Sequence, residues 1–524
     1  MDHVIPWDVI VVGSGATGGW AAHELGRHGL RVLVLEAGRD RGDAPRPGRQ
    51  RWYQAKRYAD RGLRWRRNQM RHHGYWEIDP SLWVIDRFHP FEAAPGTDFE
   101  WIRTRAVNGR LLTWGGIGVR MSDHEFFAPR ADGFGEPWPF GYSELAAHYD
   151  RIDEFLPVYG EHDGLAQLPD GHYVGAPQLT DAEHHVRAAA REQLGLDVIA
   201  GRGVLIRPHA RPRGEAPPPS PVRAAVARFG VTLRTNAIVS EVLTDAAGRA
   251  RGVTVVDRLT RRKEQLAGRA IVLAASTLES TRILLNSRSP QHPEGLGNSS
   301  GALGHYLMDH VGVHLGGYTP GRRDAAWDDG YGGPKNLMVP RHHNLANRPG
   351  GAFLRGWGSF GTVGRLPPGA DCRPDEVRFS VVSYGEMLPQ FGNHVSLHPT
   401  RRDAWGIPIL RVEAAFSDNE LALREAMVAG LSELIDAAGG RPDAHPDHLA
   451  PGGFVHEVGT ARMGSDPATS VLNEYAQSWD VPNLFVVDGA AWPTNAWQNP
   501  TFTMMAVAGR ACARLAGELA AGRM

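Results

Sequence analysis

A glycine-rich turn near the start of the chain is the sequence feature with the clearest chemistry. Residues 7–12 (WDVIVV) predict a buried parallel strand, and the following segment GSGATGG places Gly13, Gly15 and Gly18 at the spacing GxGxxG. Gly13 allows a tight turn, Gly15 lets the backbone approach a pyrophosphate, and Gly18 lets the next helix pack closely on the strand. Because the first N–H groups of that helix are unpaired, they attract a diphosphate. The turn therefore predicts a dinucleotide site.

An acidic residue completes this unit. A helical pattern runs to about Gly29, a second strand spans residues 31–35, and Glu36 follows it directly. The carboxylate of Glu36 can accept hydrogen bonds from ribose hydroxyls, and its charge disfavours a 2′-phosphate. An ordinary glycine-rich turn is the alternative, but the strand–turn–helix–strand order favours dinucleotide binding. The motif alone does not separate NAD from FAD.

Three further segments carry residues suited to a cofactor. Residues 108–116 (NGRLLTWGG) form a second glycine-rich loop whose backbone could approach a flat ring, with an ordinary turn as the alternative. Near the C-terminus, residues 454–464 read FVHEVGTARMG and residues 497–503 read WQNPTFT. A strand that ends at Asp488 would place this carboxylate on a cofactor hydroxyl. Pro500 suits the first turn of the final helix, whose unpaired N–H groups could stabilise negative charge on a bound ring.

The composition is that of an ordinary globular protein with almost no net charge. The 524 residues are 42% hydrophobic, and the 57 basic and 58 acidic residues nearly cancel. The aromatic content excludes disorder for most of the chain, and the charge balance gives no sign of a nucleic-acid partner. Cys372 and Cys512 are the only cysteines, which excludes a disulfide framework and a cysteine-rich metal site, so no metal is predicted. Without a signal pattern or an apolar run of roughly 18–20 residues, we expect a cytoplasmic enzyme with no membrane contact.

The elements expected between these motifs return to a nucleotide-binding pattern after an interval. Short strands are expected at residues 231–233, 238–243 and 252–257. A buried strand at residues 270–275 leads into a helix at residues 277–286. The nucleotide-binding domain is therefore expected to be discontinuous, with other material inserted.

Strands dominate residues 313–412 and predict a single sheet platform, with segments at 379–384, 393–397 and 407–416, before an amphipathic helix at 417–437. The predicted fold class is α/β, or α+β overall: a discontinuous Rossmann-like domain with an inserted substrate domain built on a mainly antiparallel sheet. The expected division gives 1–45, 96–150, 200–312 and 455–524 to the nucleotide-binding domain, 46–95 to a lid or oligomer excursion, and 151–199 and 313–454 to the substrate-binding domain.

Residues 41–73 are an irregular excursion rich in Arg, Pro and Gly. Its basic cluster interleaves with tryptophans and consists of Arg57, Arg61, Arg64, Arg66, Arg67 and Arg71 with Trp52, Trp65 and Trp76. A solvated or interface face is the favoured interpretation, and recognition of an anionic group or partner is the alternative. A proline-rich connector is also expected over residues 204–225.

Together these segments resemble the glucose–methanol–choline (GMC) flavoprotein oxidoreductase family. The matching pieces occur in family order over nearly the whole chain: GSGATGG with LEAG, NGRLLTWGGIGVRMS, AASTLESTRILLNS, GNSSGALGHYLMDH, NHVSLHPTRRDAWGIP, HEVGTARMG and NLFVVDGAAWPTNAWQNPT. The ending, a His and later an Asn, is most similar to the branch of pyranose oxidases and bacterial glycoside 3-oxidases or 3-dehydrogenases. The resemblance implies an FAD cofactor.

The resemblance also implies roles near the C-terminus. Oxidation of an alcohol removes a hydroxyl proton, which a base must take, and a carbinol hydride, which is expected to pass to flavin N5. By resemblance His456 is the base and Asn499 is the second polar group at the substrate hydroxyl; an imidazole, with a pKa of roughly 6.5, is neutral at working pH. His394 is a weaker pocket candidate, with sheet packing favoured. Trp492 and Trp497 flank the Asn, and each is expected either to stack on a sugar ring or to pack in the core.

The residues expected to contact FAD come from all of these motifs. They are Gly13, Gly15, Ala16, Thr17, Gly18, Glu36, Ala37, Arg110, Thr113, Trp114, Gly115, Gly116, Val239, Ala275, Asp488, Gly489, Asn499, Pro500 and Thr501. In pyranose oxidases a histidine of the loop similar to NGRLLTWGG can carry the flavin covalently. Thr113 stands at that position here, so non-covalent FAD is predicted. Asn108 stands where a glycine is common in the family.

The favoured function is FAD-dependent oxidation of a secondary hydroxyl of a sugar or glycoside, at C2 or C3, to a ketone, with O2 or another electron acceptor. Oxidation of a polyol, a sterol, an aminoglycoside intermediate or a primary alcohol is the alternative within the same enzyme class. Two competing hypotheses are a non-redox lyase of GMC type and a flavin-binding protein without turnover. A homo-oligomer is one interpretation of the excursion at residues 46–95.

Overall fold

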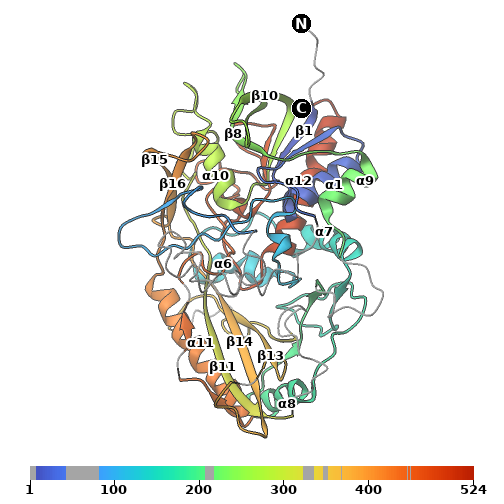
Figure 1. The fold of residues 1–524 in the computed structure, drawn as a ribbon, viewed down its shortest axis with the longest axis vertical. Helices are drawn as coiled ribbons and strands as arrows, with labels where there is room; N and C mark the ends of the chain where they lie inside the picture. Colours follow the sequence, from blue (N-terminus) through green and yellow to red (C-terminus); the bar gives the residue numbers. More distant parts are fainter. Residues whose placement is uncertain are drawn as a thin grey trace.

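Two large sheets lie at opposite ends of an elongated molecule (Figure 1). The structure is a computed structural model that describes residues 7–42, 82–206, 218–322, 336–345, 352–367, 369–444, 446–448 and 450–524. The predicted Arg- and Trp-rich cluster and half of the proline-rich connector lie outside the described residues. Among the helices of the described ranges, none combines the length and the apolarity needed to cross a bilayer.

The first sheet contains the predicted nucleotide-binding unit. Its seven strands run in the order β7-β2-β1-β10-β9-β8, with β19 paired to β10. The pairs β1–β2, β1–β10, β2–β7 and β10–β19 are parallel, whereas β9 pairs antiparallel with both β10 and β8. The strand bounds are β1 Trp7–Val12, β2 Val32–Leu35, β7 Thr232–Arg234, β8 Ala237–Thr244, β9 Ala250–Asp257, β10 Lys263–Leu273 and β19 Leu484–Val486. All seven strands were expected from the sequence, although β10 begins earlier than the expected segment at 270–275, and they form a Rossmann-type sheet.

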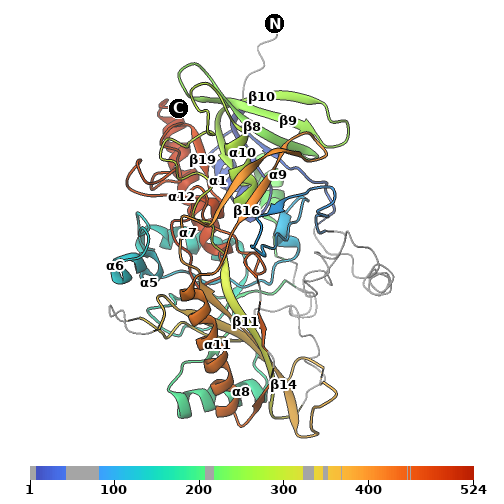
Figure 2. The same cartoon turned by 90° about the vertical axis from the view of Figure 1, so that its left-hand side faces the viewer.

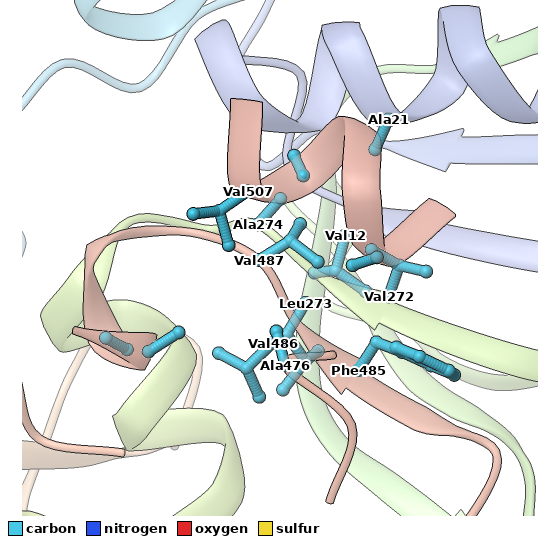
Figure 3. Packing of buried hydrophobic residues seen from close by; sticks show 14 of the residues in the cluster. Val12, Ala21, Val272, Leu273, Ala274, Ala476, Phe485, Val486, Val487 and Val507 are labelled. Atoms are coloured by element: carbon cyan, nitrogen blue, oxygen red, sulfur yellow. The ribbon is translucent and has the colours of Figure 1, made fainter. Parts of the chain in front are cut away.

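Helices from distant parts of the chain cover this sheet. Helix α1 (Ala16–Arg27) packs against both α9 (Pro221–Phe229) and the C-terminal helix α12 (Thr501–Ala520), and α10 (Thr277–Asn286) follows β10. Figure 3 shows the resulting core, in which Ala21 of α1 and Val507 of α12 lie with Val12, Leu273 and Val486 of three parallel strands. All five side chains are at most 4% exposed. Full burial of such an aliphatic side chain contributes about 1.5–3 kcal/mol, so this core fixes the ends of the chain to one sheet.

The turn between β1 and α1 depends on its glycines. Gly13 has a φ of +102°, and a Cβ there would lie 2.3 Å from the carbonyl oxygen of Ala274. A Cβ on Gly18 would lie 2.1 Å from the carbonyl oxygen of Gly13. Both positions therefore exclude a side chain for reasons of protein packing alone.

The second sheet is antiparallel and carries one long helix on one face. Its order is β17-β11-β14-β13-β12-β5, with β18 paired to β11. Helix α11 (Asp418–Ala437) packs on β11 and β14 (Figure 2), and Gly385 permits the close approach, since a Cβ there would lie 2.2 Å from Leu423 and Met427 of the helix. The strand bounds are β5 Ile199–Ala200, β11 His310–Pro320, β12 Leu337–Val339, β13 Trp357–Val363, β14 Glu376–Glu386, β17 Arg441–Pro442 and β18 Asp447–His448.

The expected single platform over residues 313–412 was wrong. Strands β15 (His394–Arg402) and β16 (Pro408–Glu413) do not join the second sheet; they form a three-stranded sheet with β3 (Glu92–Ala93) and lie beside α10. The reason is that β16 pairs with a two-residue strand more than 300 residues earlier in the chain, a partner that local sequence does not reveal. The mixed α/β class with a mainly antiparallel second sheet is confirmed.

The remaining elements are short or connect the sheets. They are α5 Asp123–Phe126, α6 Ala128–Asp132, α7 Tyr142–Phe155, α8 Asp181–Ala189, β4 Val158–Tyr159, β6 Gly203–Val204, the 3₁₀ turns Gly109–Leu112 and Gly489–Ala491, and a π turn at Ala190–Leu194. Strands β4 and β6 pair with each other.

Candidate active site

His456 and Asn499 lie side by side. Asn499 immediately precedes the residue that caps α12, and its Nδ2 lies 3.3 Å from Nε2 of His456. The side chain of Asn499 is buried, and its Oδ1 has no hydrogen-bond partner among the described residues. A buried acceptor without a partner costs stability, so a donor such as a hydroxyl is the natural complement of this atom. The pair therefore combines a proton acceptor with an amide that can hold the same hydroxyl.

Asp309 holds the loop that carries His456. Its carboxylate accepts a backbone hydrogen bond from Phe454 (3.1 Å) and another from His456 (3.0 Å). Burial, together with the neighbouring carboxylate of Glu457, raises the pKa of Asp309 to about 7. The backbone carbonyl of Asp309 also accepts from Nδ2 of Asn495, in the segment that leads to Asn499. One residue thus connects the two segments that carry the pair.

His310, the first residue of β11, contacts His456 directly. Its Nδ1 lies 2.9 Å from Nδ1 of His456, and its Nε2 lies 2.6 Å from the carbonyl oxygen of Ala496. The side chain is fully buried, and burial lowers its pKa to about 4. The rings of Tyr384 and Phe454 stand next to His310, with centroids 5.4 and 6.3 Å away, so its surroundings are mainly aromatic.

Arg110 reaches the residues on both sides of His456. Its Nη1 donates to Oε2 of Glu457 at 2.8 Å and also to the carbonyl oxygen of Val455. Val455 has a φ of +59°, a strained conformation for a β-branched residue. Arg110 was predicted to bind the cofactor; the contacts formed by its guanidinium stabilise the turn that presents His456.

Asp309 and His310 were not among the predicted site residues. They end the segment GNSSGALGHYLMDH, which the family resemblance includes. The available signal was an adjacent acid and imidazole at the start of a strand, β11, that is rich in apolar residues and glycine. The contacts of His310 with His456 and Ala496 span 146 and 186 residues of sequence, and no local pattern indicates such contacts.

The two predicted glycine-rich loops lie against each other. A Cβ on Gly109 would lie 3.4 Å from the Cα of Gly15, which begins α1. A Cβ on Gly15 or on Gly115 would meet no atom within 4 Å, so both backbones face open space. Asn108, the departure from the usual glycine, has a φ of +73°, and asparagine is one of the few residues that tolerates this conformation. The sequence departure therefore keeps the backbone geometry.

Two buried carboxylates end strands of the first sheet. Glu36 follows β2; its Oε2 accepts from the hydroxyl of Ser14 at 2.6 Å and its Oε1 from the backbone of Gly38 at 2.7 Å. Asp488 follows β19 and accepts from the hydroxyl of Ser280 at 2.5 Å and from the backbone of Ala490 at 3.0 Å. Burial raises the pKa of Glu36, and it raises the pKa of Asp488 to about 6. Both lie at the carboxyl end of the parallel strands, the edge where open α/β sheets bind ligands.

The other predicted cofactor residues fall into four places. Ala16 and Thr17 open α1, Pro500 and Thr501 open α12, Ala37 and Val239 lie near the edge formed by β8, and Thr113, Trp114 and Gly116 follow the 3₁₀ turn of the second loop. Ala275 donates its backbone N–H to Ser280, which also bonds Asp488, and Gly489 packs against Thr277 and Glu457. The structure thus gathers most of these residues around the starts of α1, α10 and α12. Their contacts with a cofactor remain predictions.

The two tryptophan candidates are fully buried, whereas His394 is half-buried. Trp492 and Trp497 are both 0% exposed. Trp492 packs edge-on against Trp138, and Trp497 covers Gly358, where a Cβ would lie 2.1 Å from its ring. No ring face is left for a sugar, so packing is the correct interpretation for both. His394 stacks on His305 at the end of β15.

Comparisons with known proteins agree with this arrangement. Residues 220–312 and 389–508 match two family profiles described as GMC oxidoreductase, and residues 8–112 match one described as FAD dependent oxidoreductase. The chain is 28% identical to the 2-methyl-1,2-propanediol dehydrogenase of Mycolicibacterium austroafricanum, over 96% of this chain and 94% of that one. It is 27% identical to the paromamine 6′-oxidase of Streptomyces fradiae, over 98% and 92%. It is also 28% identical to a C-glycoside 3-oxidase of Microbacterium trichothecenolyticum, over 55% of each chain.

A solved structure shares the fold over almost the whole chain. The crystal structure of pyridoxine 4-oxidase from Mesorbium loti superimposes with a TM-score of 0.63, at 18% identity, and covers 97% of this chain and 99% of that one. At this identity the likeness concerns the fold alone.

The residues at the sheet edge fit an FAD molecule. Gly15 leaves backbone facing open space at the start of α1, where unpaired N–H groups attract a diphosphate, and Gly115 of the second loop also faces open space. Glu36 places a buried carboxylate where a ribose is expected. Asn499, beside His456, has a buried side-chain oxygen with no hydrogen-bond partner in the described part of the chain. With the profile matches, these features show that the chain belongs to the GMC oxidoreductase family and is an FAD-dependent oxidoreductase that acts on alcohol groups.

Proposed function

We propose that the enzyme oxidises a secondary hydroxyl of a sugar or glycoside, at C2 or C3, to a ketone, with His456 as the base and Asn499 as the residue that holds the substrate oxygen. Bound FAD would supply the acceptor for the carbinol hydride. The observation that carries the proposal is the pair itself: Nε2 of His456 lies 3.3 Å from Nδ2 of Asn499, so a proton acceptor and an amide donor lie side by side. A hydroxyl that donates its proton toward Nε2 and accepts from Nδ2 would be held by both side chains.

Similarity to C-glycoside 3-oxidases over about half of the chain supports the choice of a glycoside. A second candidate substrate class is a smaller diol or an aminoglycoside hydroxyl. The similarity to the 2-methyl-1,2-propanediol dehydrogenase and to the paromamine 6′-oxidase supports it, since both alignments cover nearly the whole chain. Both candidates require the same proton transfer to His456 and differ in the pocket around the rest of the substrate.

Anaerobic flavin reduction distinguishes the candidates. The holoenzyme is mixed with aryl glycosides, free pyranoses, 2-methyl-1,2-propanediol and paromamine, and loss of the visible flavin absorbance is followed. We expect a glycoside to bleach the flavin fastest, and its 3-deoxy and 2-deoxy analogues to show which hydroxyl reacts. Faster bleaching by the diol or paromamine would support the second candidate. No bleaching by any of these alcohols would contradict both, and is the result that a non-redox lyase would give.

Two further parts of the proposal concern the cofactor and the domains. Thr113 stands where a flavin-bearing histidine would be required, and its hydroxyl donates to the carbonyl oxygen of Arg110 at 3.2 Å, so we propose non-covalent FAD. We also propose that the first sheet belongs to the FAD-binding domain and the second to the substrate-binding domain. Peroxide formation in air, measured after a bleaching substrate is found, would separate O2 from another electron acceptor.

A further inference from the structure

We propose that His310 is a positioning residue that fixes the tautomer of His456, so that Nδ1 of His456 carries the proton and Nε2 carries the lone pair that accepts the substrate's hydroxyl proton. The inference rests on the proposed role of His456 as the base. It adds a second imidazole that touches neither the substrate nor the cofactor and acts only through His456.

The hydrogen bond to Ala496 determines the protonation of His310. A carbonyl oxygen only accepts hydrogen bonds, so Nε2 of His310, 2.6 Å from the oxygen of Ala496, must carry a proton. The ring is fully buried among aromatic side chains, where a charged imidazolium is disfavoured. A neutral imidazole with its proton on Nε2 has a lone pair on Nδ1. His310 therefore offers His456 an acceptor.

The short contact between the two rings then determines the protonation of His456. The two Nδ1 atoms are 2.9 Å apart, a distance that requires one donor and one acceptor. Since Nδ1 of His310 accepts, Nδ1 of His456 must donate, and the lone pair of neutral His456 lies on Nε2. That atom faces Nδ2 of Asn499, which is a donor, at 3.3 Å. The orientation of Asn499 therefore agrees with the tautomer that His310 imposes.

The same bond serves during proton transfer. When the hydroxyl proton moves to Nε2, His456 becomes an imidazolium, and its Nδ1–H continues to donate to the lone pair of His310. A serine protease achieves this with an aspartate at the corresponding nitrogen. Here the charged neighbours of the pair are Asp309 and Glu457, whose oxygens bond backbone N–H groups and Arg110 respectively, and the direct partner of Nδ1 is the neutral ring of His310.

Two substitutions separate the two hydrogen bonds of His310. The amide oxygen of His310→Asn falls near the position of Nδ1 and can accept from His456, but its side chain is too short to reach Ala496. The amide nitrogen of His310→Gln falls near the position of Nε2 and can donate to Ala496, but it leaves no acceptor at Nδ1. His314→Gln is the matched control, since His314 lies on the same strand and bonds Ser380 instead.

The experiment measures anaerobic flavin reduction of the three holoenzymes and wild type by a bleaching substrate at pH 7 and pH 9, with substrate affinity and FAD content. We expect His310→Gln to reduce its flavin roughly 10²-fold to 10⁴-fold more slowly, the range that a positioned general base contributes, because the wrong tautomer has no lone pair on Nε2. Its deficit should persist at pH 9, because the tautomer ratio of a neutral ring does not depend on pH. His310→Asn should stay within about tenfold of wild type, and His314→Gln should match wild type.

The ranking of the variants decides the outcome. Equal rates of flavin reduction in His310→Gln and wild type would overturn the proposal. Faster flavin reduction in His310→Gln than in His310→Asn would also overturn it, because His310 would then serve only through its structural bond to Ala496. Undiminished reduction by His456→Ala would instead refute the proposed base. If the His310 variants do not fold, a measurement on the wild-type protein still tests the proposal. In its ¹⁵N-histidine NMR spectrum, the signals of His456 are assigned as those that are absent from His456→Ala. These signals must show a protonated Nδ1 and an unprotonated Nε2. The opposite assignment would refute the role of His310.

Discussion

Gly15 allows a test in which cofactor affinity and protein stability separate. A Cβ at this position meets no protein atom within 4 Å, and the residue has a φ of −68° and a ψ of −160°, which any L-residue adopts. We therefore expect Gly15→Ala to change the free energy of unfolding of the apoprotein by at most about 1 kcal/mol, the scale of an altered N-cap. The added methyl group points to where the pyrophosphate is expected. An overlap of one methyl costs about 1–3 kcal/mol, which weakens FAD binding roughly 10-fold to 10²-fold.

The matched control is Gly18→Ala, on the same turn. Its Cβ would lie 2.1 Å from the carbonyl oxygen of Gly13, so it should lower the stability of the apoprotein by about 1–3 kcal/mol or more. The assay is urea unfolding of the two apoproteins and titration with FAD, followed by flavin fluorescence. Wild-type FAD affinity in Gly15→Ala would refute the placement of the pyrophosphate at the start of α1. A large loss of apoprotein stability in the same variant would refute the open space at Gly15.

Three further predictions concern the site. Asn499→Leu replaces the amide, a hydrogen-bond donor and acceptor, by an apolar side chain of similar shape. We expect anaerobic flavin reduction to slow about 10-fold to 10²-fold with little loss of bound FAD. An unchanged rate would exclude Asn499 from holding the substrate oxygen. The pKa of Asp309 is raised from 3.8 to about 7, so ionisation of this carboxyl lowers stability as pH rises between those values. Between pH 5 and pH 7.5 that fall amounts to about 2–3 kcal/mol; it should be absent from urea unfolding of Asp309→Asn at the two pH values, and an identical pH dependence in both proteins would refute it. Acid precipitation should leave FAD in the supernatant, and flavin retained in the pellet would contradict non-covalent binding.

The sequence predicted best those elements whose determinants are local. The helix at 277–286 has the bounds expected from its apolar pattern, and the helix at 417–437 begins one residue later than expected. In the latter, Glu420 accepts from both the backbone and the hydroxyl of Ser417, a capping interaction within four residues of sequence. The glycines of the first turn were equally readable from their GxGxxG spacing, and a Cβ on Gly18 would lie 2.1 Å from the carbonyl oxygen of Gly13 in the same turn.

Features that depend on distant contacts were not predictable in the same way. Residues 101–107 have a strand-like composition, yet they form only single bridges, at Thr104 and Ala106, because no neighbouring strand continues the pairing. The proximity of His456 and Asn499 followed from family resemblance, since nothing local relates them. The role of His310 was not foreseen, because its partners come from two loops far along the chain that meet at the start of β11.

The most direct test is anaerobic flavin reduction by a glycoside in wild type and in His456→Ala, with both proteins holding stoichiometric FAD. We expect the wild-type flavin to bleach within the mixing experiment and the flavin of His456→Ala to bleach at least about 10²-fold more slowly, because the hydroxyl proton then lacks its acceptor. Equal rates of bleaching in the two proteins would contradict the assignment of His456 as the base.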